Sequence, residues 1–192
     1  MAYELNTQLS SGVTEEEFLK LCVDNRDLRI EKDDQGNVLA SSPACSEIGC
    51  FNASLTAELG TWNKKSKAGY VFDSSTGFTL PNSAVRSPDV SLILKDKWEA
   101  LPKAEKKKFA RVCPDFVIEI VSASDNLKQV QSKMSEWISQ GASLGWLIDF
   151  DHQKVWIYTA DGRIEEHPFD QQLNGTGPID GFTVTLPEVV KG

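Results

Sequence analysis

Two carboxylates in the sequence stand where apolar side chains would be expected. Glu119 lies inside the run FVIEIV, and Asp89 directly precedes the apolar run VSLIL. A buried carboxylate costs several kcal/mol unless it is paired, protonated or bound to a metal ion. Carboxylate oxygens suit Mg²⁺ (or Mn²⁺), and such an ion would polarise a scissile phosphate and activate a water molecule. Since an acid in a strand is also often a salt-bridged structural group, the pattern alone leaves both interpretations open.

The elements around these acids would place them in one sheet. Residues 116–121 are almost entirely apolar, as expected of a central strand covered on both faces. Side chains alternate along a strand, so Glu119 should share a face with Val117 and Val121. A second strand is expected over residues 90–94. The helix expected next, over residues 125–140, has a buried stripe of Leu127, Val130, Met134, Trp137 and Ile138.

The rest of the chain predicts an α/β fold with a mixed β-sheet flanked by helices. Thr14 and Glu17 have the spacing of a capping box, which predicts a first helix over residues 14–22. Apolar residues at helical spacing predict another helix over residues 48–62, and a turn at Asp34–Asn37 predicts a hairpin over residues 28–40. Further strands are expected at residues 70–72, 77–80, 144–148, 155–158 and 163–165. We interpret residues 1–192 as a single domain.

The composition limits the partners of the chain. Its formal net charge of −8 argues against bulk attraction to nucleic acid or to an anionic membrane. Any contact with DNA would use a local basic cluster, either Lys64–Lys67 or the lysine-rich stretch 103–111, although both fit solvated surfaces equally well. No apolar run approaches the ~20 residues that cross a bilayer, and MAYELNTQLS does not resemble a secretory signal, so a cytoplasmic location is expected.

Metal chemistry based on cysteine or histidine is not indicated. The four cysteines include no pair with C-x-x-C spacing, and the two histidines are too few for a histidine cluster. We expect the four cysteines to be reduced, as in most intracellular proteins. Carboxylates are therefore the metal ligands to consider.

Several stretches together resemble a known family. SPDVSLIL, CPDFVIEIVSASD, a lysine in the following helix and QGASLGWLIDF are similar to the bacterial Uma family of putative restriction endonucleases, which is placed in the PD-(D/E)XK nuclease superfamily. VTEEEFLKLC and VFDSSTGFTLPNSAVRSPDVS also match its style, so the resemblance covers nearly the whole chain. It implies a restriction-endonuclease-like core.

The resemblance assigns roles to four residues. Asp89 corresponds to the first acid of the family pattern and Glu119 to the acid of the (D/E)XK half-motif, and both would bind the metal ion. The half-motif reads Glu-Ile-Val here, so Val121 stands where its lysine would be. The family pattern places a lysine in the next helix instead, and Lys133 matches it. Lys133 could also be a surface lysine with a partly buried stem.

Glu47 is the fourth candidate. It falls where related nucleases carry a further acid, but a charge favoured at a helix N-terminus explains it equally well.

The function implied is metal-dependent hydrolysis of phosphodiester bonds in DNA. A homodimer is plausible, because cutting both strands needs two sites. The alternative is a catalytically inactive nuclease-fold module that binds nucleic acid or protein, since fold does not fix function.

Overall fold

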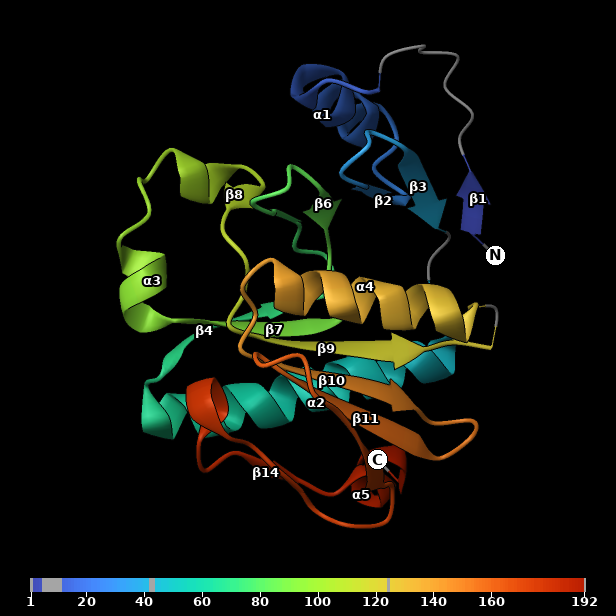
Figure 1. Cartoon of the computed structure of the whole chain (residues 1–192), viewed down its shortest axis with the longest axis vertical. Coiled ribbons are helices and arrows are strands. Elements are labelled where there is room, and N and C mark those ends of the chain that lie inside the picture. Colours follow the sequence, from blue (N-terminus) through green and yellow to red (C-terminus); the bar gives the residue numbers. More distant parts are fainter. Residues whose placement is uncertain (1, 5–11, 42–43, 124, 192) are drawn as a thin grey trace.

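The computed structural model describes residues 2–4, 12–41, 44–123 and 125–191, and within them two six-stranded sheets (Figure 1). The N-terminal sheet has the order β1 (Ala2–Glu4), β3 (Val38–Ser41), β2 (Arg29–Lys32), β6 (Val85–Arg86), β5 (Phe78–Thr79) and β8 (Ala110–Arg111). The central sheet has the order β12 (Ile164–Pro168), β11 (Lys154–Thr159), β10 (Leu144–Asp149), β9 (Phe116–Val121), β7 (Val90–Leu94) and β4 (Gly69–Asp73). A small third sheet pairs β13 (Leu173–Asn174) with β14 (Thr183–Val184).

The helices are α1 (Glu15–Asp24), α2 (Ser46–Ser66), α3 (Lys95–Glu99), α4 (Leu127–Ser139) and α5 (Leu186–Lys191), with short 3₁₀ turns η1 (Glu105–Lys107) and η2 (Gly177–Ile179). The capping box expected for α1 is present, because the Thr14 hydroxyl accepts from the Glu17 backbone and the Glu17 carboxylate accepts from the Thr14 backbone. None of the helices in the described ranges is long and apolar enough to span a membrane.

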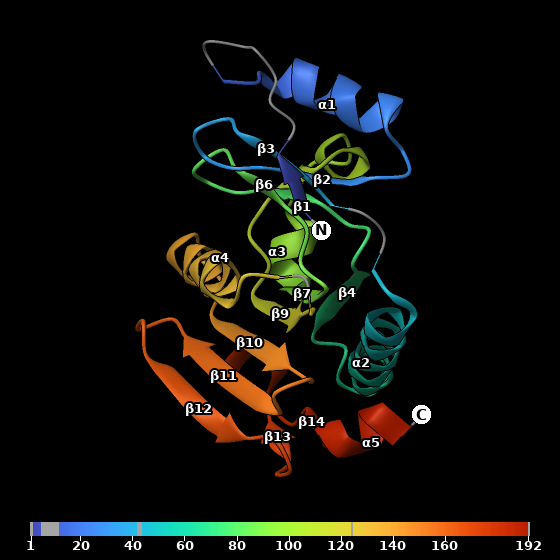
Figure 2. The same ribbon diagram turned by 90° about the vertical axis from the view of Figure 1, so that its right-hand side faces the viewer.

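The central sheet is mixed, and its strand β9 is covered on both faces, as the sequence predicts. Strand β9 runs parallel to β10 and antiparallel to β7. Figure 2 shows α2 and α4 on opposite sides of this sheet. Alternate β9 residues Phe116, Ile118 and Ile120 pack in the core that includes α2. Val117 and Val121 pack instead with Trp137 of α4, so Glu119 between them faces α4.

The expected hairpin forms, but it belongs to the N-terminal sheet and not to the central sheet. Strands β2 and β3 are antiparallel, and Ile30 and Val38 pack with Phe18 of α1 in a separate small core. Figure 1 shows the N-terminal sheet and α1 beyond α4, away from α2. The charged residues Arg29 and Glu31 of β2 thereby contact the segment that leads into β7, where the candidate site lies.

Candidate active site where the two sheets meet

Glu119 is a buried carboxylate held from α4. Only 4% of the residue is exposed. The indole Nε1 of Trp137 donates to its Oε1 over 2.8 Å, and Nζ of Lys133 lies 2.9 Å from the same oxygen. Among the described residues, no hydrogen bond reaches the other oxygen, Oε2.

Asp89 lies beside Glu119 because β7 and β9 are paired. Val90 is opposite Ile118 in the register, so the residue before it falls next to Glu119. The Asp89 backbone donates to the Ile118 carbonyl over 3.0 Å, and Oδ2 of Asp89 accepts from the backbone N–H of Ile120 over 2.7 Å. These two bonds fix the carboxylate of Asp89 against β9.

Lys133 extends from the middle of α4 into the same cluster. Besides the contact with Glu119, its ammonium donates to Oε1 of Glu31 over 2.9 Å and to the Ser87 carbonyl over 3.0 Å. Its side chain is 17% exposed. The structure thus brings Asp89, Glu119 and Lys133 together, although their chemical roles stay predictions.

Four residues of the site were not predicted from the sequence, and two of them, Arg29 and Glu31, belong to β2. Nη1 of Arg29 donates to Oδ1 of Asp89 over 2.9 Å, and Nη2 donates to the Ser87 carbonyl. Glu31 accepts from the Ser87 backbone over 2.9 Å as well as from Lys133. The available signal was the alternation in the hairpin strand, which puts both charged residues on one face.

The outer edge of the cluster is formed by Arg86. Its Nε lies 2.7 Å from Oε2 of Glu136, and its Nη1 lies 3.5 Å from Oε2 of Glu31. Four carboxylates and three cations thus compensate one another where the two sheets meet: Glu31, Asp89, Glu119 and Glu136, with Arg29, Arg86 and Lys133.

Burial and neighbouring charges set the protonation of the cluster. Burial raises the pKa of Glu119 to about 7. The positive charge of Lys133 offsets only part of this effect, and the negative charge of Asp89 adds to it. Burial also opposes ionisation of Glu31, but Lys133, Arg29 and Arg86 outweigh it and hold its pKa down to about 2. For Lys133, burial lowers the pKa, but Glu119 and Glu31 outweigh that effect and raise it. Lys133 is therefore an ammonium at neutral pH.

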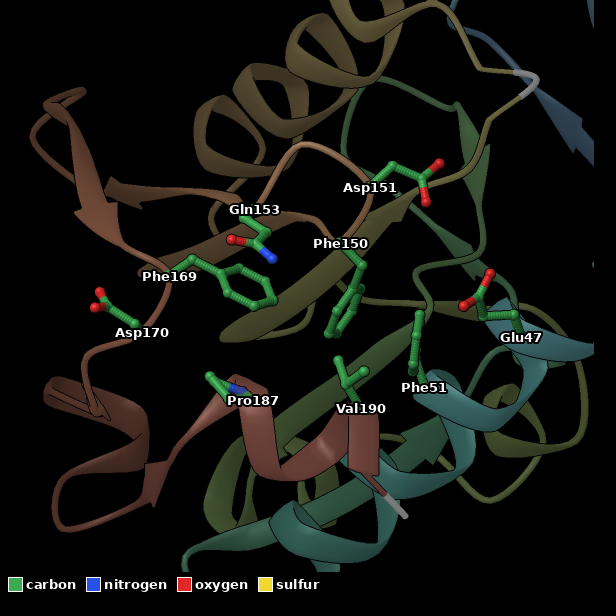
Figure 3. Close-up of a pocket in the computed structure, with 9 residues that line it drawn as sticks. All are labelled: Glu47, Phe51, Phe150, Asp151, Gln153, Phe169, Asp170, Pro187 and Val190. Carbon is green, nitrogen blue, oxygen red and sulfur yellow. The ribbon is translucent and has the colours of Figure 1, made fainter.

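Glu47 lies elsewhere. It is exposed in the first turn of α2 and lines a pocket of about 280 Å³ with Phe51, Phe150 and Phe169. Figure 3 shows Glu47 and two aspartates, Asp151 and Asp170, around these three rings. No contact between described residues joins Glu47 to Asp89 or Glu119, so its role stays a prediction from the sequence alone.

The carboxylate oxygens available at this site are of the type that a hard divalent cation prefers as ligands. Mg²⁺ commonly uses one or two carboxylates and completes its shell with water and substrate oxygens. Asp89 and Glu119 supply two carboxylates, and Oε2 of Glu119 has no hydrogen-bond donor among the described residues. Within those ranges, no group of three or more His, Cys, Asp or Glu side chains is arranged around a common ion position. Asp89 and Glu119 are the two neighbouring carboxylates that could hold such an ion.

Comparison with known proteins agrees with this fold. The sequence profile of the Uma2 family, described as "Putative restriction endonuclease", matches residues 15–187. The chain is also similar in structure to a putative nuclease of the DUF820 family from Anabaena variabilis ATCC 29413. The TM-score is 0.71 at 19% identity, over 84% of this chain and 89% of that one. No curated protein matches the sequence. Since the profile spans most of its length, the chain belongs to the Uma2 family of putative restriction endonucleases.

Proposed function

We propose that this chain, as one nuclease domain over residues 1–192, hydrolyses phosphodiester bonds in DNA with the help of a divalent cation, Mg²⁺ or Mn²⁺. The observation that carries the proposal is the buried group of Asp89, Glu119 and Lys133, in which Lys133 lies 2.9 Å from Glu119. Membership of a family described as restriction endonucleases supports a nucleic acid as the substrate. A homodimer would supply the two sites needed to cut both strands.

Asp89 and Glu119 would hold the cation. Bound there, it would polarise the scissile phosphate and lower the pKa of water, which is what the hydrolysis needs at neutral pH. The chain positions both carboxylates in advance, because the Ile120 backbone holds Asp89 and the Trp137 indole holds Glu119. Such preorganisation avoids rearrangement during the reaction.

Lys133 would act as a fixed positive charge. Because Glu31 and Glu119 raise its pKa, it stays protonated at neutral pH and does not serve as a general base. A cation at this place neutralises the negative charge that develops on the phosphate and orients the attacking water. Its position on α4 compensates for the apolar Val121 in the half-motif.

One observation favours the alternative, a nuclease-fold module without activity. Arg29 already pairs with Asp89, and Lys133 pairs with both Glu31 and Glu119, so the cluster is stable as an internal salt-bridge network. Such a module would bind nucleic acid or protein through the same fold.

Metal binding and cleavage together test the proposal. Calorimetric titration with Mn²⁺ should show binding that Asp89→Asn and Glu119→Gln abolish and that Glu165→Gln, at an exposed acid of β12, retains. Supercoiled plasmid should be nicked or linearised by the wild type with Mg²⁺ or Mn²⁺ and not by Glu119→Gln. Absence of Mn²⁺ binding in the folded wild type would favour the inactive module instead.

A further inference from the structure

Arg29 is the most accessible cation of the site. Its side chain is 31% exposed, compared with 17% for Lys133 and 12% for Arg86. It reaches from β2 to the segment that leads into β7, where it contacts Asp89 and the Ser87 carbonyl. The side chain is therefore partly open to solvent while its guanidinium is bound to the site.

The contact with Asp89 has a consequence for the proposed metal site. Oδ2 of Asp89 accepts from the Ile120 backbone, and Oδ1 accepts from Arg29. Each oxygen already accepts a hydrogen bond, and a divalent cation bound through Oδ1 would share or take over the oxygen that Arg29 holds. Glu119 differs, because Lys133 and Trp137 both contact Oε1, and no hydrogen bond between described residues involves Oε2.

A displaced Arg29 would remain at the site. It extends from a paired strand, and the Ser87 carbonyl gives it a second anchor. A guanidinium is planar and matches the two oxygens of a phosphate in a fork-like, bidentate contact. It would be released beside the cation that displaces it, where the proposed function would place the phosphodiester.

The net charge of the cluster also favours binding of a phosphate once the metal ion is bound. Its four carboxylates and three cations leave one negative charge when all are ionised. A divalent cation turns this into one positive charge, which a phosphodiester monoanion balances. The metal ion and the phosphodiester would thus favour each other's binding.

We propose that Arg29 is a substrate-binding residue that exchanges partners, pairing with Asp89 in the metal-free protein and with a substrate phosphate when the metal ion is bound. The proposal rests on the proposed function, because it needs Asp89 to be a metal ligand. It makes Arg29 the residue that couples metal binding to phosphodiester binding.

The test is a Mn²⁺ titration of the full chain by calorimetry, with and without dimethyl phosphate, a simple phosphodiester monoanion. Arg29→Met removes the competing cation, and Arg163→Met removes an exposed arginine near the β11–β12 turn as a matched charge control. Because the guanidinium no longer competes for Oδ1 of Asp89, Arg29→Met should bind Mn²⁺ about 10-fold or more tightly than Arg163→Met when no phosphodiester is present. Dimethyl phosphate should tighten Mn²⁺ binding in the wild type and not in Arg29→Met.

The outcomes separate the two proposals. If Arg29→Met and Arg163→Met bind Mn²⁺ equally, and Asp89→Asn abolishes binding, the metal site stands and the exchange is wrong. If dimethyl phosphate tightens binding equally in Arg29→Met and the wild type, Arg29 does not bind the phosphate. If neither the wild type nor Arg29→Met binds Mn²⁺, the proposed function fails together with the exchange.

Arg29→Lys provides a second variant, should loss of the cation beside Asp89 unfold the protein. It keeps the positive charge but cannot make the bidentate contact of a guanidinium. The Mn²⁺ affinity of Arg29→Lys should therefore stay within about 3-fold of the wild type, while dimethyl phosphate should tighten Mn²⁺ binding less than it does in the wild type. An undiminished effect in Arg29→Lys would contradict the bidentate contact on which the proposal depends.

Discussion

Replacing Lys133 with Met removes the charge at the centre of the cluster while keeping the bulk of the stem. The ammonium lies 2.9 Å from both Glu119 and Glu31 and 3.0 Å from the Ser87 carbonyl. Removing one partner of a buried ion pair costs about 3–5 kcal/mol, because the remaining charge is buried without compensation. Glu31 keeps two arginines, so we expect the lower part of this range, about 3 kcal/mol at pH 7.

The cost should depend on pH in a defined direction. Lys133 has a raised pKa, so its contribution is present below the pKa of an unfolded lysine and is lost only as the pH rises through its folded pKa. Glu119 has a pKa of about 7, so at pH 5 it is protonated and no longer needs the cation. Lys133→Met should therefore lose less stability at pH 5 than at pH 7.

Urea unfolding of Lys133→Met at both pH values measures this difference. Lys128→Met, an exposed position on the same helix, is the matched control. In parallel, plasmid cleavage by Lys133→Met should be lost under conditions in which the variant is folded. The reasoning is refuted if Lys133→Met and Lys128→Met unfold within about 0.5 kcal/mol of each other at pH 7, the usual range for surface substitutions. Full cleavage by Lys133→Met, with Glu119→Gln inactive, would refute its role in the chemistry.

Three further predictions follow from the site and the surface. Because the pKa of Glu119 is raised, its protonated form contributes stability that is fully present below pH 4.5 and is lost as the pH rises to about 7. Glu119→Gln should remove this pH-dependent contribution, on the order of 3 kcal/mol, from the free energy of unfolding in urea. If the free energy of unfolding varies with pH in Glu119→Gln as it does in the wild type, the raised pKa is wrong. Reversing the charge of Lys106, Lys107 and Lys108 together should weaken DNA binding and flatten its salt dependence if this stretch contacts DNA, and equal affinity in a filter-binding or anisotropy assay would identify it as a solvated face. Glu47→Gln should retain Mn²⁺ affinity and plasmid cleavage, because Glu47 lines a separate pocket and no contact between described residues joins it to the cluster. Loss of either would restore the role predicted from the sequence.

Local patterns were sufficient to predict the main elements. The apolar run around Glu119 predicted a covered central strand, and β9 occupies that position with a helix on each side. The capping box at Thr14 and the turn before Val38 likewise predicted α1 and the β2–β3 hairpin. Such patterns can be read directly because the spacing of side chains on a helix or strand is fixed by local backbone geometry.

The sequence also indicated which residues carry charge in an apolar setting. Asp89 and Glu119 stand out because burial of a carboxylate is costly, and Lys133 lies at helical spacing from Val130 and Trp137 on the buried stripe. The resemblance to the Uma family supplied the connection between these three residues. Their position in one cluster then depended on the pairing of β7 with β9 and on α4 covering that face.

Only the tertiary structure decided the surroundings of the site. Arg29 is 60 residues from Asp89, and Glu31 is 102 residues from Lys133, so no local pattern could link them. Glu47 is the reverse example, because the sequence named it as a candidate site residue and the structure places it at a separate pocket. Alternation and helical spacing determine which face a side chain occupies, but not which distant element that face meets. That choice is made where β2 meets the segment before β7 and the helix α4, which gives Arg29 its partner Asp89 and Glu31 its partner Lys133. The protonation of Glu119 depends mainly on its burial under α4 and on Lys133 and Asp89 beside it.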